Sequence, residues 1–190
     1  MIAIIGRIAS GKTTLCKNLH NRHFSTFNCD EFYEKNYLKN GLFYNAINEK
    51  IGDFLNDDFG INKEKIKSWI NQNKSHLGLL EKYTYPILYE YLKNHHFDFV
   101  EIPKIISKYC DFSNLFSGII CIENSTEKEQ KKWKSRGVDN FLKNKISAEN
   151  DPFYMKKQLF GRKTIVNIYE YNCENDEIID LFLSLLSLND

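Results

Sequence analysis

The stretch Gly6-Arg7-Ile8-Ala9-Ser10-Gly11-Lys12-Thr13 decides the fold of this chain, because it fits the phosphate-binding pattern G-x-x-x-x-G-K-[ST] at every specified position. The apolar run at residues 2–5 before it predicts a buried strand, and residues 14–19 after it predict a helix. Glycines let the backbone curl so that successive amides face phosphate oxygens, and the helix adds its positive end. The sequence therefore predicts a phosphate-binding loop between a strand and a helix.

Particular roles follow from the residue types in this loop. We expect Lys12 to reach the β- and γ-phosphates of a nucleotide and the Thr13 hydroxyl to hold Mg²⁺. The other residues expected to contact the nucleotide are Gly6, Ile8, Ala9, Ser10, Gly11 and Thr14. The alternative is a strand-to-helix turn that binds no ligand, and the match of both motif and context argues against it.

Length and composition predict a single α/β domain over residues 1–190. The hydrophobic content of 42% is enough for one sizeable core. No apolar run approaches the roughly 18 residues of a membrane span, and the first residues lack a basic leader and a cleavage pattern, so we expect a cytoplasmic protein. Five scattered cysteines argue against a disulfide framework and a zinc site.

Apolar runs after the loop predict a parallel five-stranded sheet in a three-layer α/β/α fold. Further strands are expected at 24–29, 97–102, 118–123 and 164–169. The core segments are then about 1–36, 97–125 and 164–190, with a helical substrate-binding insertion at about 37–96 and a lid at about 126–163. Pro86 is expected to interrupt the long helical stretch. Ile178, Leu181, Phe182 and Leu185 line one face of a final helix expected to pack on the sheet.

Aromatic residues are frequent in the predicted insertion. They could line a substrate pocket, although their helical spacing favours a core role for each. The residues are Phe43, Tyr44, Phe54, Phe59, Trp69, Tyr83 and Tyr85.

Asp30 stands where the second predicted strand stops. In open parallel sheets the ligand lies outside the carboxyl ends of the strands, so an acid at this position is expected to face the phosphates. Asp30 could act as the general base toward a substrate hydroxyl, or orient Mg²⁺ through water. The alternative is a helix N-cap for residues 31–34, and the two roles are compatible.

Basic residues are concentrated in one segment. Between Glu127 and Lys163 there are eleven Lys or Arg against five Asp or Glu. A helix expected at 127–136 places Lys128, Lys132 and Arg136 on one face. We expect Arg136, whose planar fork can hold two phosphate oxygens, to close over the transferring phosphate as a catalytic cation. A nucleic-acid surface and a solvated basic face are the alternatives.

Taken in series, these features resemble the dephospho-CoA kinase family along nearly the whole chain. They are the loop at 6–13, Asp30, Tyr85-Pro86-Ile87, Val100-Glu101-Ile102-Pro103, a basic helix bearing Gln130, and Asn172. The chain differs from the family pattern at Tyr85-Pro86, where His-Pro is usual, and at Pro103-Lys104-Ile105, where Pro-Leu-Leu is usual. With Arg136 as the anchor of the alignment, Lys132 is the nearest match to a second lid arginine, whereas aligning Gln130 instead shifts the register by one residue.

The resemblance implies a P-loop kinase that moves the γ-phosphate of ATP, with Mg²⁺, to the ribose 3′-hydroxyl of dephospho-CoA. In that case Asp30 matches the catalytic acid, Lys12 and Thr13 the phosphate and Mg²⁺ ligands, and Arg136 the lid arginine. The alternatives are a kinase for another nucleoside or nucleotide, and a module whose ATP-controlled attachment uses the basic segment. We expect no nucleic-acid or membrane partner, and the sequence does not predict the oligomeric state.

Overall fold

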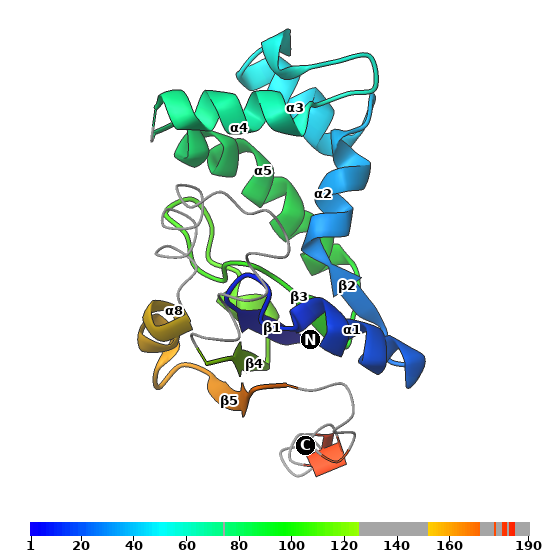
Figure 1. The fold of residues 1–190 in the computed structure, drawn as a ribbon, viewed down its shortest axis with the longest axis vertical. Coiled ribbons are helices and arrows are strands. Elements are labelled where there is room, and N and C mark those ends of the chain that lie inside the picture. The colour runs from blue at the N-terminus through cyan, green and yellow to red at the C-terminus, as the bar shows by residue number, and fades with distance from the viewer. Residues whose placement is uncertain (74, 126–151, 172–176, 178–179, 182, 185–190) are drawn as a thin grey trace.

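The computed structural model describes residues 1–73, 75–125, 152–171, 177, 180–181 and 183–184, and structural statements below concern these residues. Figure 1 shows a sheet at one end of the molecule and a group of helices rising from it. The strands are β1 (Ile2–Gly6), β2 (Thr26–Asn28), β3 (Phe99–Glu101), β4 (Gly118–Glu123) and β5 (Thr164–Tyr169). The α-helices are α1 (Lys12–Asn21), α2 (Cys29–Tyr37), α3 (Leu42–Lys50), α4 (Lys63–Gln72), α5 (Ser75–Asn94) and α8 (Pro152–Leu159). Short 3₁₀ turns occupy Asp53–Leu55 and Ser113–Leu115.

The five strands form one parallel sheet in the order β2-β3-β1-β4-β5. This confirms the predicted fold class. β1 is central, and the register aligns Asn28 at the end of β2 with Glu101 at the end of β3. The phosphate-binding loop therefore leaves the sheet at the edge where β2 and β3 also end, which brings residues from three strands to one site.

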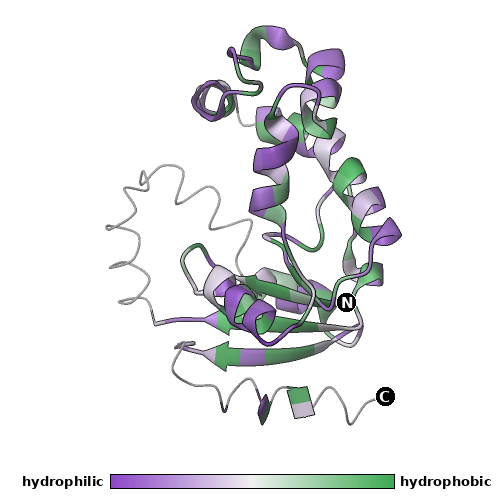
Figure 2. Cartoon of the chain, turned by 90° about the vertical axis from the view of Figure 1, so that its right-hand side faces the viewer, coloured by the Kyte–Doolittle hydropathy of each residue, from purple (hydrophilic) through white to green (hydrophobic). Residues whose placement is uncertain are grey.

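Alternate side chains of the strands bury themselves on opposite faces of the sheet. Ala3 and Ile5 belong to the core that includes α5 and α8, whereas Ile2 and Ile4 pack with Leu15 and the rest of α1. Figure 2 shows the strands as mainly hydrophobic, while the helices carry residues of both kinds. Burial on both faces accounts for the nearly continuous apolar runs of β1, β3 and β4, and the helices on the two faces give the three layers.

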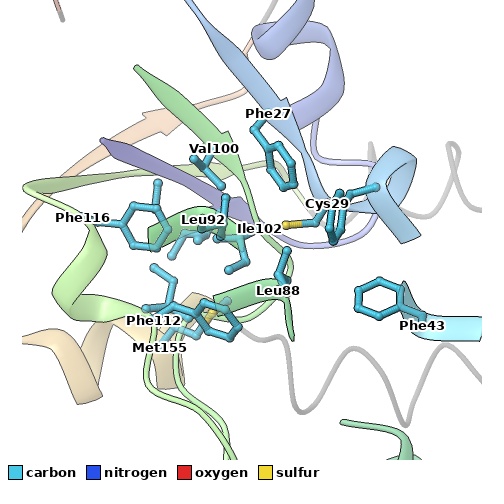
Figure 3. Close-up of a cluster of buried hydrophobic side chains, with 14 of the residues drawn as sticks. Phe27, Cys29, Phe43, Leu88, Leu92, Val100, Ile102, Phe112, Phe116 and Met155 are labelled. Atoms are coloured by element: carbon cyan, nitrogen blue, oxygen red, sulfur yellow. The ribbon is translucent and has the colours of Figure 1, made fainter. Parts of the chain in front are cut away.

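One apolar core runs from the sheet into the helical insertion. Val100 and Ile102 of the β3 region contact the same cluster as Leu88 and Leu92 of α5, as Figure 3 shows. Phe43 of α3, fully buried, extends this cluster into the insertion. The insertion is therefore fixed to the sheet by shared side-chain packing.

Pro86 does not interrupt the helix, contrary to the sequence prediction. α5 runs unbroken from Ser75 to Asn94 with Pro86 inside it. A proline in a helix interior removes one backbone hydrogen bond and crowds the preceding turn. Burial of Leu80, Leu88 and Leu92 on both sides of Pro86 offsets that cost, so tertiary packing prevails over local preference.

Other boundaries differ from the predictions at the sheet edge. β2 and β3 are each three residues long, shorter than predicted, because they pair with each other only over that length. In the final helical segment Leu181 is 63% exposed rather than packed on the sheet, whereas Leu183 contacts the core on the α1 side. Ile178, Phe182 and Leu185 lie outside the described residues.

The described helices include none that combines the length and the apolar character needed to cross a lipid bilayer.

Candidate functional site

The backbone of the loop explains its two fixed glycines. A Cβ on Gly6 would lie 2.5 Å from both the Ile122 carbonyl oxygen and Ser10 Oγ, so no larger residue fits. Gly11 adopts a φ of 111° immediately before α1 begins at Lys12, a left-handed conformation that favours glycine. The loop is thus a tight curl that ends at a helix N-terminus, the geometry that suits an anion.

Lys12 and Asn124 hold the loop in this shape. Lys12 Nζ donates to the carbonyl oxygens of Gly6 and Arg7, each at 3.0 Å, so its ammonium lies over the curl. Asn124, which follows β4, donates to the Ser10 carbonyl oxygen at 2.9 Å. Ser10 Oγ is buried and has no hydrogen-bond partner among the described residues. Three side-chain hydrogen bonds therefore hold the carbonyl groups of the loop, and within the described part of the chain the Ser10 hydroxyl is left unpaired.

The predicted site residues other than Arg136 line one cavity of about 350 Å³. Every loop residue expected to contact the nucleotide is present, and Asp30 lies on the same wall. The lining residues are Gly6, Ile8, Ala9, Ser10, Gly11, Lys12, Thr13, Thr14, Cys29, Asp30, Glu101 and Pro103. Arg136, together with Lys128, Lys132 and the rest of the predicted lid helix, lies outside the described residues.

Glu101 is a site residue that the sequence reasoning missed. It ends β3, is 5% exposed, and accepts hydrogen bonds from Thr13 Oγ1 at 3.0 Å and Asn28 Nδ2 at 2.8 Å. Burial raises the pKa of Glu101, although Lys12 and the Thr13 bond oppose the rise. The sequence did offer a signal for Glu101, because it is an acid at the end of an apolar strand, just as Asp30 follows the strand before it.

Asn28, rather than Asp30, caps α2, so the N-cap role considered for Asp30 is wrong. Asn28 Oδ1 accepts from the Glu31 backbone amide at 3.1 Å while its Nδ2 bonds Glu101. Asp30 lies in the first turn of α2, exposed to the cavity. One asparagine therefore connects the helix that carries Asp30 to the buried carboxylate.

The residues present fit a Mg²⁺–nucleotide complex. Mg²⁺ prefers oxygen ligands, and the Thr13 hydroxyl and Glu101 carboxylate lie 3.0 Å apart on a wall that also carries Asp30. Phosphate oxygens need donors and positive charge, which the curled amides, the start of α1 and Lys12 supply. The site therefore has the donor set for a polyphosphate and a hard cation.

A second cavity of about 340 Å³ adjoins the first and shares Asp30 and Pro103 with it. Its walls come from α2, α5 and the segment after β3, and are largely apolar and aromatic. They comprise Asp30, Tyr33, Tyr37, Leu77, Leu80, Glu81, Thr84, Tyr85, Leu88, Ile102, Pro103, Lys104 and Phe112. Asp30 therefore lies between the cavity of the loop, the phosphate cradle, and this second cavity, the aromatic cavity.

The aromatic residues singled out in the sequence do not share one role. Tyr85 lines the second cavity, Phe43 is in the core, and Phe59 is 79% exposed. Burial raises the pKa of Tyr33 and of Tyr85, so both keep a neutral hydroxyl. Tyr33 donates to Thr84 Oγ1 at 3.1 Å, which fixes its ring at the cavity wall.

Burial disfavours the thiolate form of two cysteines near the site. Cys29 lines the first cavity and Cys16 lies in α1, and both are buried. Burial raises the pKa of each thiol, with Asp30 adding to the effect at Cys29 and Glu101 at Cys16. A thiol kept protonated neither attacks a substrate nor binds a metal at neutral pH.

Comparison with known proteins gives a consistent set of relatives. No family model matches the chain. A protein named dephospho-CoA kinase from Mycoplasma pneumoniae is 25% identical over 87% of this chain and 85% of its own length. One of the same name from Mycoplasma genitalium is 25% identical over 79% of each. The resemblance seen in the sequence is thus confirmed at the level of divergent relatives.

Solved structures agree on the fold. A crystal structure from Thermus thermophilus aligns with a TM-score of 0.69 and 18% identity, covering 98% of this chain and 96% of the other. Dephospho-CoA kinase from Campylobacter jejuni aligns with a TM-score of 0.60 and 18% identity, covering 100% and 98%. The sheet order, the loop and these neighbours together identify a P-loop α/β fold.

Proposed function

We propose that this P-loop phosphotransferase, a divergent relative of the dephospho-CoA kinases, transfers the γ-phosphate of ATP to the ribose 3′-hydroxyl of dephospho-CoA and so forms coenzyme A. One observation carries the proposal: Asp30 lies on the wall shared by the phosphate cradle and the aromatic cavity. A carboxylate at that boundary meets both the phosphate that leaves one substrate and the hydroxyl that attacks from the other.

In this mechanism the loop amides and Lys12 hold the polyphosphate, and Asp30 accepts the proton of the attacking hydroxyl. Thr13 and Glu101 would hold Mg²⁺, which would neutralise part of the negative charge of the polyphosphate. Asn28 keeps Glu101 turned toward Thr13 and holds the first turn of α2, which carries Asp30. The chain thereby orients donor and acceptor before any bond changes.

Arg136 is proposed, from the sequence, to add a second cation above the transferring phosphate. Its planar guanidinium suits the charge that spreads over the phosphoryl oxygens in the transition state. Arg136→Lys keeps the charge but loses the fork, so it separates a bidentate role from a point charge. We expect Arg136→Lys to lower kcat with little change in the KM for ATP.

A coupled ADP-release assay tests the proposal. The protein is incubated with ATP and Mg²⁺ together with dephospho-CoA, adenosine, uridine, thymidine monophosphate or no acceptor. We expect release that requires dephospho-CoA, and its loss in Lys12→Ala but not in Lys17→Ala, which changes an exposed lysine of the same helix. Activity with another acceptor alone would point to a different nucleoside kinase. An absence of ADP release with every acceptor, together with steeply salt-dependent polyanion binding, would favour a binding module.

A further inference from the structure

The aromatic cavity carries a buried ion pair in its wall. Lys104 Nζ lies 3.4 Å from Glu81 Oε1, and the two side chains are 13% and 11% exposed. The Tyr85 hydroxyl donates to the same carboxylate oxygen at 3.3 Å, and the Tyr85 ring packs edge-on against Phe112. Glu81 belongs to α5 and Lys104 follows β3, so the pair spans the junction of insertion and sheet.

Stability does not account for this pair. The cost of removing two charges from water usually cancels most of their attraction, and apolar residues of similar volume stabilise a protein as well or better. The surrounding wall is apolar, as the presence of Leu77, Leu80 and Leu88 shows. A carboxylate beside an ammonium instead gives that wall a hydrogen-bond acceptor and a donor next to each other.

With the sugar hydroxyl of the acceptor at Asp30, as the proposed function has it, the orientation of the acceptor in the aromatic cavity follows. A nucleoside whose sugar hydroxyl meets Asp30 projects its base into the aromatic cavity, where Tyr33 and Tyr85 offer ring faces and edges for contact. The base edge then meets Glu81 and Lys104. A carboxylate accepts from an exocyclic amino group, and an ammonium donates to the ring nitrogen beside it.

This pattern matches adenine and opposes hypoxanthine. Adenine presents an amino donor at C6 next to the N1 acceptor, whereas a 6-oxopurine presents a carbonyl acceptor next to an N1–H donor. We propose that Glu81 and Lys104 select the base of the acceptor, taking 6-aminopurine nucleosides in preference to 6-oxopurine nucleosides. This inference rests on the proposed function, because it places the sugar hydroxyl of the acceptor at Asp30.

The test compares dephospho-CoA with its counterpart in which hypoxanthine replaces adenine. We expect the wild type to favour adenine in kcat/KM by at least about tenfold, since a site built for one hydrogen-bond pattern leaves buried groups unpaired with the other. Glu81→Gln should raise the KM for dephospho-CoA about tenfold or more, with a smaller effect on kcat. The charge-swapped variant Glu81→Lys/Lys104→Glu keeps an ion pair and should reverse the preference.

A control on the same helix separates recognition from general charge effects. Glu90 and Lys93 of α5 form an exposed pair at 3.9 Å. Glu90→Gln should leave the adenine preference unchanged. An unchanged preference in both Glu81→Gln and the charge-swapped variant would overturn the inference while the proposed function stands; if the swapped variant fails to fold by circular dichroism, Glu81→Gln decides.

Binding measurements keep the inference testable if no acceptor is phosphorylated. Adenosine and inosine are titrated into the wild type and Glu81→Gln by calorimetry. We expect the wild type to bind adenosine more tightly and Glu81→Gln to lose that difference. Equal binding of adenosine and inosine by the wild type would overturn the inference, whatever the phosphate-transfer assay shows.

Discussion

At the residue scale, the site depends on a carboxylate that is stabilised by few contacts. Glu101 is buried between Thr13 and Asn28, both of which donate to it, and Lys12 lies close enough to oppose the rise in its pKa. The charged form of Glu101 is nevertheless less stable in the native protein than in water, because desolvation is the largest cause of the shift in its pKa. The charged form of Glu101 is therefore expected to lower the free energy of unfolding at neutral pH.

Glu101→Gln should therefore stabilise the protein at neutral pH and impair catalysis. With the pKa of Glu101 raised above 4.5, the native state binds more protons there than the unfolded chain, so the free energy of unfolding falls as pH rises through the raised pKa. Glu101→Gln has no carboxylate at this position, so its free energy of unfolding does not fall in this way as pH rises. We expect its melting temperature to exceed that of the wild type at pH 7 and to match it near about pH 4, with activity about 10- to 100-fold lower.

Thermal melts across pH, beside the coupled assay, check this prediction. Glu90→Gln, which removes an exposed carboxylate, serves as the control and should change neither quantity appreciably. A variant that is less stable than the wild type at pH 7 would show that the Thr13 and Asn28 bonds outweigh the desolvation of Glu101.

At the element scale, two asparagine caps have the same local chemistry and different consequences. Asn28 caps α2 beside the site, and Asn62 caps α4 by accepting from the amides of Glu64 and Lys65. Either asparagine changed to alanine should cost about 1 kcal/mol of stability. Asn28→Ala should also lower kcat several-fold, because it releases Glu101 and the first turn of α2.

Chemical denaturation and steady-state kinetics of Asn28→Ala and Asn62→Ala measure these effects side by side. Equal kcat values in the two variants would mean that the bond from Asn28 to Glu101 has no part in catalysis.

α5 shows how packing overrides a local signal. Pro86→Ala restores an amide that can donate to the carbonyl oxygen of Lys82. Replacing a proline in a helix interior raises the free energy of unfolding by up to about 3 kcal/mol. The greater conformational freedom of the unfolded variant lowers it by about 1 kcal/mol. We expect a net stabilisation of about 2 kcal/mol, or about 4–8 °C in melting temperature.

Calorimetry of Pro86→Ala beside Lys93→Ala, an exposed change in the same helix, provides the measurement. A melting temperature for Pro86→Ala below that of the wild type would indicate that α5 needs the proline to fit its neighbours.

At the scale of the whole molecule, a bound nucleotide should stabilise the native state. The cradle draws on β1 and α1, and the adjoining Glu101 on β3, so a bound nucleotide contacts groups that come together only on folding. Ligand at 100 times its dissociation constant adds about 2.7 kcal/mol, which for this size is about 5–10 °C. Mg²⁺ with ADP should therefore raise the melting temperature by that amount.

Differential scanning fluorimetry measures this rise in melting temperature, with a chelator and Lys12→Ala as comparisons. Removing Mg²⁺ should reduce the shift, since Thr13 and Glu101 then lose their shared cation, and Lys12→Ala should nearly abolish it. An undiminished shift in Lys12→Ala would place the nucleotide elsewhere on the protein.

The sequence by itself determined the fold class and half of the site. The pattern at 6–13 needs two glycines and a lysine at fixed spacing, because backbone curl and charge must coincide within a few residues, and such local requirements are visible in a linear chain. The strands at 118–123 and 164–169 were found to the residue. The first is buried on both faces and therefore almost wholly apolar, whereas the second, partly exposed, is marked by its β-branched residues.

Only the tertiary structure decided the rest. The contact of Glu101 with Thr13 joins residues 88 positions apart, and the pairing of Glu81 with Lys104 depends on where α5 crosses the sheet. The continuity of α5 through Pro86 likewise follows from burial that no local signal encodes. Short-range patterns fix what the backbone must do locally, whereas long-range packing determines which distant side chains meet, and in this protein long-range packing forms the walls of the aromatic cavity.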